Sequence, residues 1–269
     1  IKAWLDRGPR PAPPLREENR ARLAAANQEQ EDNRQYFSHR VKKPRAAQAF
    51  IIINLAIFLF TVSLASDSLG IIRLDSMIAM HSIFIYPALA VYGEWWRLLT
   101  ATFLHYNYLH VGFNMLALIW FGYTVERRVG HGRFIIIYLL SGIGSMLAAI
   151  ASYELTEQTE PMLALGASGS IFGVLGAVLA LALLAYRRTK LFQARQDINA
   201  ILIIVLIQTA FDWAYLDGSS PLHISGLISG FLITLMIAPR SAVETAPGTS
   251  PEKGQAPVNQ SGEPPPDNP

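Results

Sequence analysis

The sequence predicts an all-α fold, a polytopic membrane protein whose six transmembrane helices form a bundle with a partly membrane-immersed first loop. Two observations predict this class. Of the 269 residues, 51 % are hydrophobic and only 16 % are charged, whereas a soluble domain has roughly 25 % charged residues. The charges are also concentrated in the first 45 residues and in short patches between long apolar runs, a distribution typical of a chain that crosses a membrane several times.

The composition also excludes several classes of function. The net charge of +2 provides no basic field, so nucleic-acid binding is not expected. The absence of cysteine excludes disulfides, a thiol nucleophile and a cysteine-ligated metal site. The sequence predicts no cofactor and no particular oligomeric state.

The distribution of polar residues divides the chain into three predicted regions. Residues 1–45 form a polar arm, in which about 14–36 have the composition of a polar helix without an apolar stripe; no signal peptide is recognisable there. Residues 46–239 form the membrane domain. Residues 240–269 are rich in proline and cannot form a packed core, so this tail is predicted to be disordered.

Each predicted span is an apolar run near the roughly 20 residues that cross a bilayer. The six runs are 47–65, 108–125, 134–153, 162–186, the short 198–211, and 221–238. The stretch 71–104, between the first two, is apolar and aromatic but interrupted by Pro87, Gly93, Glu94 and Arg97. We therefore expect it to be an interfacial loop, where Trp and Tyr tend to lie.

The charges of the loops orient this bundle. Arginine and lysine precede the first predicted span, separate the second from the third and the fourth from the fifth, and follow the sixth. The other loops are acidic or poor in arginine. With six spans every basic loop lies on one side, so the positive-inside tendency predicts that both termini are cytoplasmic. The simplest location is a bacterial inner membrane, with an organelle membrane as the alternative.

Polar side chains near the outer ends of three spans are candidates for function, because such groups are costly within a membrane. Ser168 opens the fourth span in the run Gly166-Ala167-Ser168-Gly169-Ser170. This run is not the G-x-S-x-G pattern of soluble hydrolases, and a serine at a helix start is commonly an N-cap. On this run alone, a nucleophile and an N-cap both remain open.

The sixth span opens with His223, and Gly226 and Gly230 lie on the same helical face, at i+3 and i+7. Small residues on such a face let two helix backbones approach closely. The fourth span carries a similar stripe that begins at Gly169. If the stripes face each other, His223 lies beside Ser168. The alternative is two separate packing faces and a histidine with another partner.

His110 and Asn114 share one face of the second span at i,i+4. Each can present an N–H donor, and two donors aimed at a nucleophile could form an oxyanion hole. The alternative is a hydrogen-bonded pair that only stabilises the bundle. Together with His105 this face could suggest zinc, but there is no H-E-x-x-H motif and no carboxylate is expected within the spans at this depth. No metal site is therefore predicted.

Together these residues resemble the rhomboid family of intramembrane serine proteases. The motifs that carry the resemblance are His110-x-x-x-Asn114, Gly166-Ala167-Ser168-Gly169, His223-x-x-Gly226-x-x-x-Gly230, Trp96-Arg97 and Glu126-Arg127-Arg128. The resemblance covers about residues 47–239, with matching order and spacing of the spans. Each motif alone is weak, and their combination on the expected helices is specific.

The resemblance implies a role for each of these positions. Ser168 would be the nucleophile and His223 its general base, in a dyad without an acidic third member. His110, Asn114 and the backbone N–H of Ser168 would hold the oxyanion. His105 would be structural or would line the cavity. The short fifth span and the loop after it would form the gate through which a substrate helix enters.

The resemblance also assigns residues around the dyad. Phe172 stands where some members of the family have a tyrosine that stacks on the catalytic histidine, so the stacking face remains and only the hydroxyl is lost. The loop with Trp96 and Arg97 would lie in the outer leaflet. The glycines that would shape the cavity and its helix packing are Gly166, Gly169, Gly226 and Gly230.

The predicted function is that of an intramembrane serine endopeptidase, which cleaves transmembrane segments of membrane-protein substrates in the lipid bilayer. One alternative is a catalytically silent rhomboid-fold protein that binds membrane clients, which would be expected to lack Ser168 or His223. Another is a small transporter or channel, which would be expected to have repeats or interrupted helices in paired halves. The sequence has no such repeat.

Overall fold

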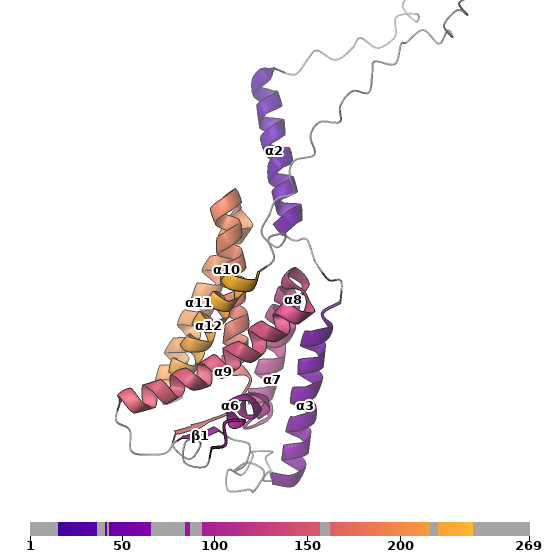
Figure 1. Ribbon diagram of the computed structural model, residues 1–269. Coiled ribbons are helices and arrows are strands. Elements are labelled where there is room, and N and C mark those ends of the chain that lie inside the picture. The colour runs from indigo at the N-terminus through magenta and orange to yellow at the C-terminus, as the bar shows by residue number, and fades with distance from the viewer. Residues whose placement is uncertain are drawn as a thin grey trace, which may run out of the picture.

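The computed structural model describes residues 16–36, 41, 43–65, 84–86, 93–156, 162–215 and 220–238. In this part of the chain the fold is a bundle of helices (Figure 1). The long helices are α2 (Glu17–Tyr36), α3 (Arg45–Ala65), α9 (His131–Leu155), α10 (Ser168–Thr189), α11 (Phe192–Tyr215) and α12 (Ser220–Ile237). The shorter elements are β1 (Phe84–Tyr86), α6 (Arg97–Thr100), the 3₁₀ turn η1 (Ala101–Phe103), α7 (Tyr108–Ala117), the π-helical turn η2 (Leu118–Gly122), α8 (Tyr123–Val129) and β2 (Met162–Ala164).

Five helical segments of the described residues are long and apolar enough to cross a membrane. They are Arg45–Leu64, Tyr108–Val129, His131–Leu155, Ser168–Thr189 and Phe192–Ala214. The last part of the bundle, Pro221–Ile237 in α12, is apolar but shorter. The helical membrane bundle is thus confirmed, whereas the count of six spans stays a prediction because α12 is shorter than the other five.

Two predicted boundaries are wrong. The fifth span is not short, because α11 runs from Phe192 to Tyr215 and includes charged residues that interrupt the apolar run at both ends. The fourth span does not begin at Met162, because residues 162–164 form β2 and the helix starts at Ser168. β2 pairs antiparallel with β1, with Phe84 opposite Ala164, so the fold contains one short strand pair that an all-α prediction omits.

The most buried helix is α10, with 78 % of its apolar window inside the protein. Glycines on α10 face α12 and α9. A Cβ atom on Gly230 would overlap the backbone of Gly173, and a Cβ atom on Gly173 would overlap Ser141 of α9. Backbones this close are the expected result of small residues on facing helices. Of the two alternatives left open by the sequence, the structure shows the one in which the two glycine stripes face each other.

The second span carries an acidic anchor for the first. Glu126 in α8 is fully buried, and its carboxylate accepts hydrogen bonds from the backbone N–H groups of Ala46 (2.8 Å) and Ala47 (2.7 Å). These groups belong to the first turn of α3, where a negative charge is favourable because the N–H groups are unpaired. His131 also contacts this carboxylate. Glu126, the first residue of the Glu126-Arg127-Arg128 patch, therefore fixes the start of the first membrane helix.

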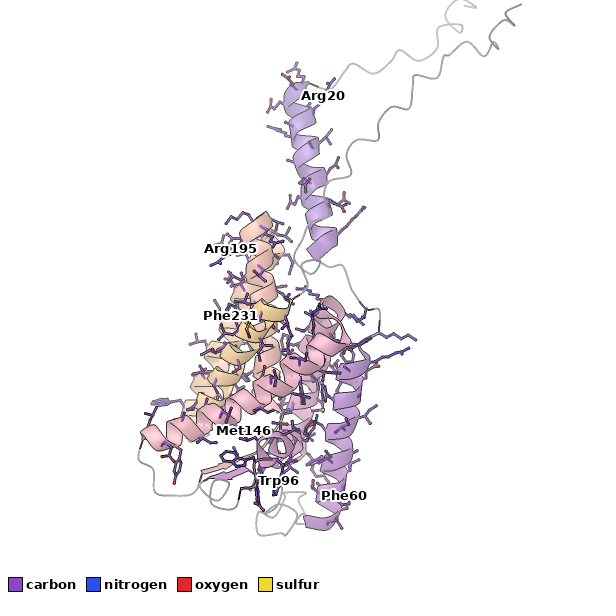
Figure 2. All side chains as sticks on the ribbon, in the orientation of Figure 1. Arg20, Phe60, Trp96, Met146, Arg195 and Phe231 are labelled. Atoms are coloured by element: carbon purple, nitrogen blue, oxygen red, sulfur yellow. The ribbon has the colours of Figure 1, made fainter. Side chains whose placement is uncertain are left out.

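The two ends of the bundle differ in composition. Figure 2 places Trp96 and Arg195 near opposite ends, in agreement with a basic side and an aromatic side of a membrane. Helix α2, which confirms the predicted polar helix within the arm, stands apart from the bundle in Figure 1. The division into arm, membrane domain and tail stays a prediction. Residues 240–269 and much of the predicted immersed loop (71–83 and 87–92) lie outside the described residues.

Candidate active site

Glycine packing brings the start of α10 beside α12. Ser168 is the first residue of α10, and the next residue, Gly169, has its carbonyl oxygen where a Cβ atom of Gly226 would lie. His223 precedes Gly226 by almost one helical turn on the same face. The end of α12 that carries His223 therefore packs against the end of α10 that carries Ser168.

The His223 ring is held against α10 by an aromatic contact. Phe172 stacks on it with the two ring centroids 4.5 Å apart and an angle of 10° between the planes. Phe172 lies one helical turn after Ser168. His223 is 8 % exposed. The stacking that the resemblance implies for this position is therefore present, with phenylalanine as the stacking side chain.

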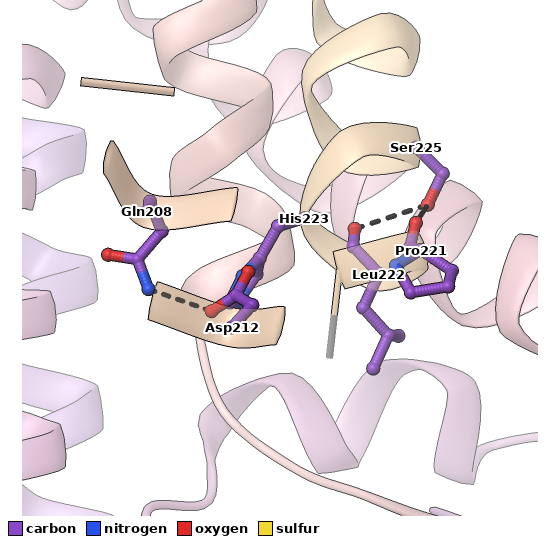
Figure 3. Close-up of polar contacts among 6 residues, drawn as sticks. All are labelled: Gln208, Asp212, Pro221, Leu222, His223 and Ser225. Carbon is purple, nitrogen blue, oxygen red and sulfur yellow. Dashed lines mark hydrogen bonds and ion pairs between the residues drawn. The ribbon is translucent and has the colours of Figure 1, made fainter. Parts of the chain in front are cut away.

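A carboxylate lies at this depth, contrary to the sequence-based expectation. Asp212 belongs to α11 and is 1 % exposed. One of its oxygens, Oδ2, lies 2.5 Å from Nδ1 of His223, and the other, Oδ1, accepts a 2.8 Å hydrogen bond from Nε2 of Gln208 (Figure 3). The expectation is wrong because it ended the fifth helix at Phe211 and assigned Asp212 to the loop.

Gly166 lets a histidine approach the serine. Its φ of +120° is a backbone conformation that favours glycine. A Cβ atom at Gly166 would lie 2.8 Å from Cε1 and Nε2 of His110, and 3.8 Å from Oγ of Ser168. The backbone N–H of Gly166 donates to the carbonyl of Ala101 (2.9 Å), which anchors this turn. The absent side chain leaves the room in which the His110 ring lies close to Ser168.

One nitrogen of the His110 ring can be identified as a hydrogen-bond donor. Its Nδ1 accepts a 3.4 Å hydrogen bond from the backbone N–H of Tyr106, so in the neutral ring the proton is on Nε2. The side-chain oxygen of Asn107, the N-cap of α7, accepts from the backbone N–H of His110 (2.9 Å) and fixes the start of the helix. Nε2, one of the two His110 atoms that lie 2.8 Å from the position a Cβ of Gly166 would take, is therefore an N–H donor.

Asn114 adds a second donor one turn further along α7. It is 7 % exposed, and among the described residues its side-chain Nδ2 is buried without a hydrogen-bond partner. A buried donor left without a partner costs roughly 1–3 kcal/mol. Such a cost is commonly retained at a functional site, and an oxyanion formed in the reaction would satisfy the donor.

His105 forms the wall behind His110. It is fully buried, and the two rings meet edge to face with centroids 5.1 Å apart. Burial, and to a smaller extent the neighbouring His110, lower the pKa of His105 from its ordinary value to about 3. His105 is therefore neutral near pH 7, and it supports the His110 ring without adding a charge.

Trp96 and Arg97 lie at the start of α6, and the contacts described for them are with other residues. The Nε of Arg97 donates to Glu94 (2.7 Å), and Arg97 is buried. Trp96 is 55 % exposed at the start of α6. Their part in the function stays a prediction.

The structure thus brings together His223 with Phe172 and Asp212, and Ser168 with Gly166 and His110. Among the residues that the structure describes, no hydrogen bond joins Ser168 to His223, so that contact stays a prediction. In the described part of the chain, no group of three or more His, Asp or Glu side chains could hold a metal ion.

Comparison with known proteins agrees with this arrangement. The family described as Rhomboid domain matches residues 92–240. The rhomboid protease GluP of Bacillus subtilis is 38 % identical over 189 residues, which cover 70 % of this chain and 34 % of GluP. The rhomboid protease AarA of Providencia stuartii is 30 % identical over 199 residues, 69 % of each chain. Rhomboid-like protease 1 of Toxoplasma gondii is 31 % identical over 192 residues, 70 % of this chain and 62 % of that one.

The chain therefore spans about a third of the length of GluP and about two thirds of the length of the other two relatives. The matched segment includes every residue of the cluster described above, from His105 to His223. On the evidence of these matches, of the helical bundle and of the glycine-packed helices, this chain belongs to the rhomboid family.

Proposed function

We propose that the chain is an intramembrane serine endopeptidase that cleaves peptide bonds in or near transmembrane segments of membrane proteins. The observation that carries the proposal is the backbone contact between Gly169 of α10 and Gly226 of α12. This contact sets the helix end with Ser168 beside the helix end with His223. The relatives reported above are named as rhomboid proteases, which supports the same reaction.

In the proposed reaction Ser168 is the nucleophile and His223 is the general base. Nε2 of His223 takes the proton from Oγ of Ser168 while Oγ bonds to the carbonyl carbon of the substrate. The tetrahedral intermediate collapses when the C–N bond breaks and the leaving amine receives that proton. Water, deprotonated by the same imidazole, then hydrolyses the acyl-enzyme and returns the proton to Ser168.

Three N–H groups are proposed to stabilise the oxyanion. They are Nε2–H of His110, Nδ2–H of Asn114 and the backbone N–H of Ser168. The last of these is at a helix N-terminus, where N–H groups are unpaired and the helix dipole favours a negative charge. Donors of this kind act strongly because they are fixed before the charge develops.

The location and substrates are further parts of the proposal. The bundle is an integral membrane domain, and the polar cluster lies at the end of α10 that follows β2. A membrane-protein helix is the proposed substrate, and the loop charges favour a bacterial inner membrane with both termini in the cytoplasm. Comparison of the membrane proteins that are cleaved with and without Ser168→Ala would identify the substrates.

The test of the proposal is labelling by a fluorophosphonate probe in detergent, in parallel with cleavage of membrane proteins in liposomes. Wild-type protein is expected to be labelled and to cleave, and both Ser168→Ala and His223→Ala are expected to lose both signals. Labelling that persists in Ser168→Ala would exclude Ser168 as the nucleophile. A wild-type protein that binds membrane proteins but neither cleaves them nor reacts would favour a catalytically silent client-binding protein.

Asn114→Ala tests the oxyanion hole separately. Loss of one such donor lowers kcat by about 10²–10³-fold. Thermal stability is expected to stay near the wild-type value, because the Nδ2 group that is removed has no partner among the described residues. A variant with unchanged kcat would show that Asn114 does not act in the reaction.

A further inference from the structure

Asp212 is a charged group in a position that needs an explanation. Its side chain is fully buried, within a helix that is long and apolar enough to cross a membrane. An ionised carboxylate without partners in such a place is strongly unfavourable, so intramembrane carboxylates are paired and commonly functional. The dyad assigned to the reaction above does not use this group.

The contacts of Asp212 fix the carboxylate in one orientation. Gln208, one turn earlier on α11, donates to Oδ1, and His223 of α12 meets Oδ2 (Figure 3). Both oxygens are thus engaged, one by the same helix and one by the next. The His223 side chain is only 10 % exposed, so little water reaches this pair.

This contact selects one form of the imidazole. A carboxylate can only accept a hydrogen bond, so Nδ1 of His223 must carry the proton that it donates. In the neutral ring the lone pair is then on Nε2. A general base needs this tautomer, because the atom that accepts the proton from Ser168 must have a free lone pair.

The orientation of the ring is fixed by two neighbours from different helices. Phe172 of α10 covers one face of the His223 ring, and Asp212 of α11 holds its Nδ1 edge. Because one contact is on the ring face and the other on its edge, the His223 ring cannot rotate freely. Nε2 lies at the opposite edge from Nδ1, and is therefore held in a constant direction from α12.

We propose that Asp212 is a positioning residue for the reaction: it fixes the tautomer and direction of His223 and stabilises the imidazolium that forms when Ser168 is deprotonated. This inference rests on the proposed function and deepens it. The arrangement becomes Ser168–His223–Asp212, in which the acid lies on α11. In soluble serine proteases an aspartate in this relation to the histidine keeps its own charge throughout the reaction.

A purely structural role is the competing explanation. The same contact joins α11 to α12, so its loss could loosen the two helices without any effect on the imidazole. The two roles differ in what they change. If the contact only holds α11 against α12, its loss lowers the unfolding temperature and the affinity for the probe. If Asp212 positions His223, its loss slows the chemical step and changes which ring nitrogen of His223 carries the proton.

The first experiment compares Asp212→Asn with Asp197→Asn. Asp197 is the matched control, because it also lies on α11 and also accepts from a glutamine four residues earlier, Nε2 of Gln193, at 3.0 Å. The fluorophosphonate reaction is measured at saturation: Oγ of Ser168 bonds to phosphorus, fluoride leaves, and the proton passes to His223. The maximal labelling rate (kinact) is separated from the half-saturating concentration (KI).

In Asp212→Asn kinact is expected to fall about tenfold or more, with little change in KI, and Asp197→Asn is expected to label like wild type. The same change in a soluble Ser-His-Asp triad lowers kcat about 10⁴-fold. Asp212→Glu is expected to recover part of the rate, because it restores an acceptor with a charge. A fall in kinact smaller than about tenfold, in a variant that unfolds at the wild-type temperature, would overturn the proposal.

The second experiment needs no substitution of Asp212. Nitrogen-15 NMR of the histidines in wild-type protein identifies the protonated ring nitrogen of His223, whose signals are those absent from His223→Ala. Protonated Nδ1 and unprotonated Nε2 are expected near neutral pH. The opposite tautomer would overturn the proposal even if Asp212→Asn failed to fold.

The two hypotheses fail in different ways. If Ser168→Ala keeps its activity, the proposed function fails and Asp212 has no reaction to support. If Ser168→Ala and His223→Ala are inactive while Asp212→Asn reacts like wild type, the protease stands and only the role of Asp212 is lost.

Discussion

Helices α10 and α11 follow each other in the chain and are packed in opposite ways. The apolar window of α10 is 78 % buried within the protein, whereas that of α11 is 11 % buried. α10 presents small residues to its neighbours, and α11 presents large apolar side chains outward, with Leu206 at 70 % exposed. One helix is fixed by close backbone contact, and the other has most of its surface available to lipid.

The difference shows where the proposed membrane protease would need rigidity. Ser168 lies on the helix that cannot move without displacing α12, so its position relative to His223 is set by backbone contacts. α11 is held less extensively and includes a polar contact to the same histidine near its end, through Asp212. The resemblance implies that the fifth helix and the following loop admit the substrate, and the slight burial of α11 is in keeping with that expectation.

The largest expected effect on activity comes from breaking the close contact between α10 and α12. In Gly226→Ala the new methyl group would overlap the carbonyl oxygen of Gly169. Overpacking of this kind costs about 1–3 kcal/mol of stability. A displacement of His223 by about 1 Å could also lower activity about 10²-fold. Labelling rate and thermal unfolding in detergent measure the two effects.

Gly112→Ala is the matched control for that substitution, because no heavy atom lies within 4 Å of the position that its Cβ would take. Alanine is preferred over glycine within a helix by roughly 1 kcal/mol. The control is expected to be as stable as wild type or slightly more so. If both variants lose stability equally, close packing of α10 against α12 is not the cause.

The next prediction compares the two helices directly. Leu175→Ala on α10 removes a side chain that is 3 % exposed and leaves a cavity, with an expected cost of about 2–5 kcal/mol. Leu206→Ala on α11 changes a side chain that already faces outward, so less than about 0.5 kcal/mol is expected. Reversible unfolding in mixed micelles would measure both. Equal losses would contradict the contrast in burial.

The smallest expected effect concerns Phe172. Phe172→Leu removes the ring that stacks on His223, and an aromatic contact of this kind is worth roughly 0.5–1.5 kcal/mol. The labelling rate is expected to fall by up to about tenfold. Phe172→Tyr keeps the stacking face, and its rate is expected to stay within about twofold of wild type because the energy of the contact is largely retained. A larger loss in the tyrosine variant would mean that the added hydroxyl disturbs the site.

The sequence predicts the parts of the site that depend on helical spacing. Gly226 and Gly230 follow His223 on one face, so the contact with α10 could be predicted from periodicity alone. His110 and Asn114 could be placed together for the same reason. That Nδ2 of Asn114 is buried without a partner could not be predicted, because it depends on how neighbouring elements pack around it. Spacing along one helix does not reveal that packing.

The sequence does not predict Asp212 or the strand pair. Hydropathy ends a membrane helix at a charge, whereas α11 continues through Asp212 because His223 on α12 donates a hydrogen bond to the carboxylate at that point. The sequence feature that could have indicated this contact is the i,i+4 pair Gln208 and Asp212, which lies shortly before His223. Residues 162–164 are as apolar as the helix after them, so only their pairing with β1 distinguishes them.

The π-helical turn η2 sets the rotational phase between the two halves of the second span. A π turn closes over one more residue than an α turn, so side chains after Gly122 point in directions that a continuous α-helix would not give them. On one side of η2 His110 is directed to the Ser168 region, and on the other Glu126 is directed to the first turn of α3. Deletion of one residue in η2 is therefore expected to prevent His110 and Glu126 from making their contacts at the same time.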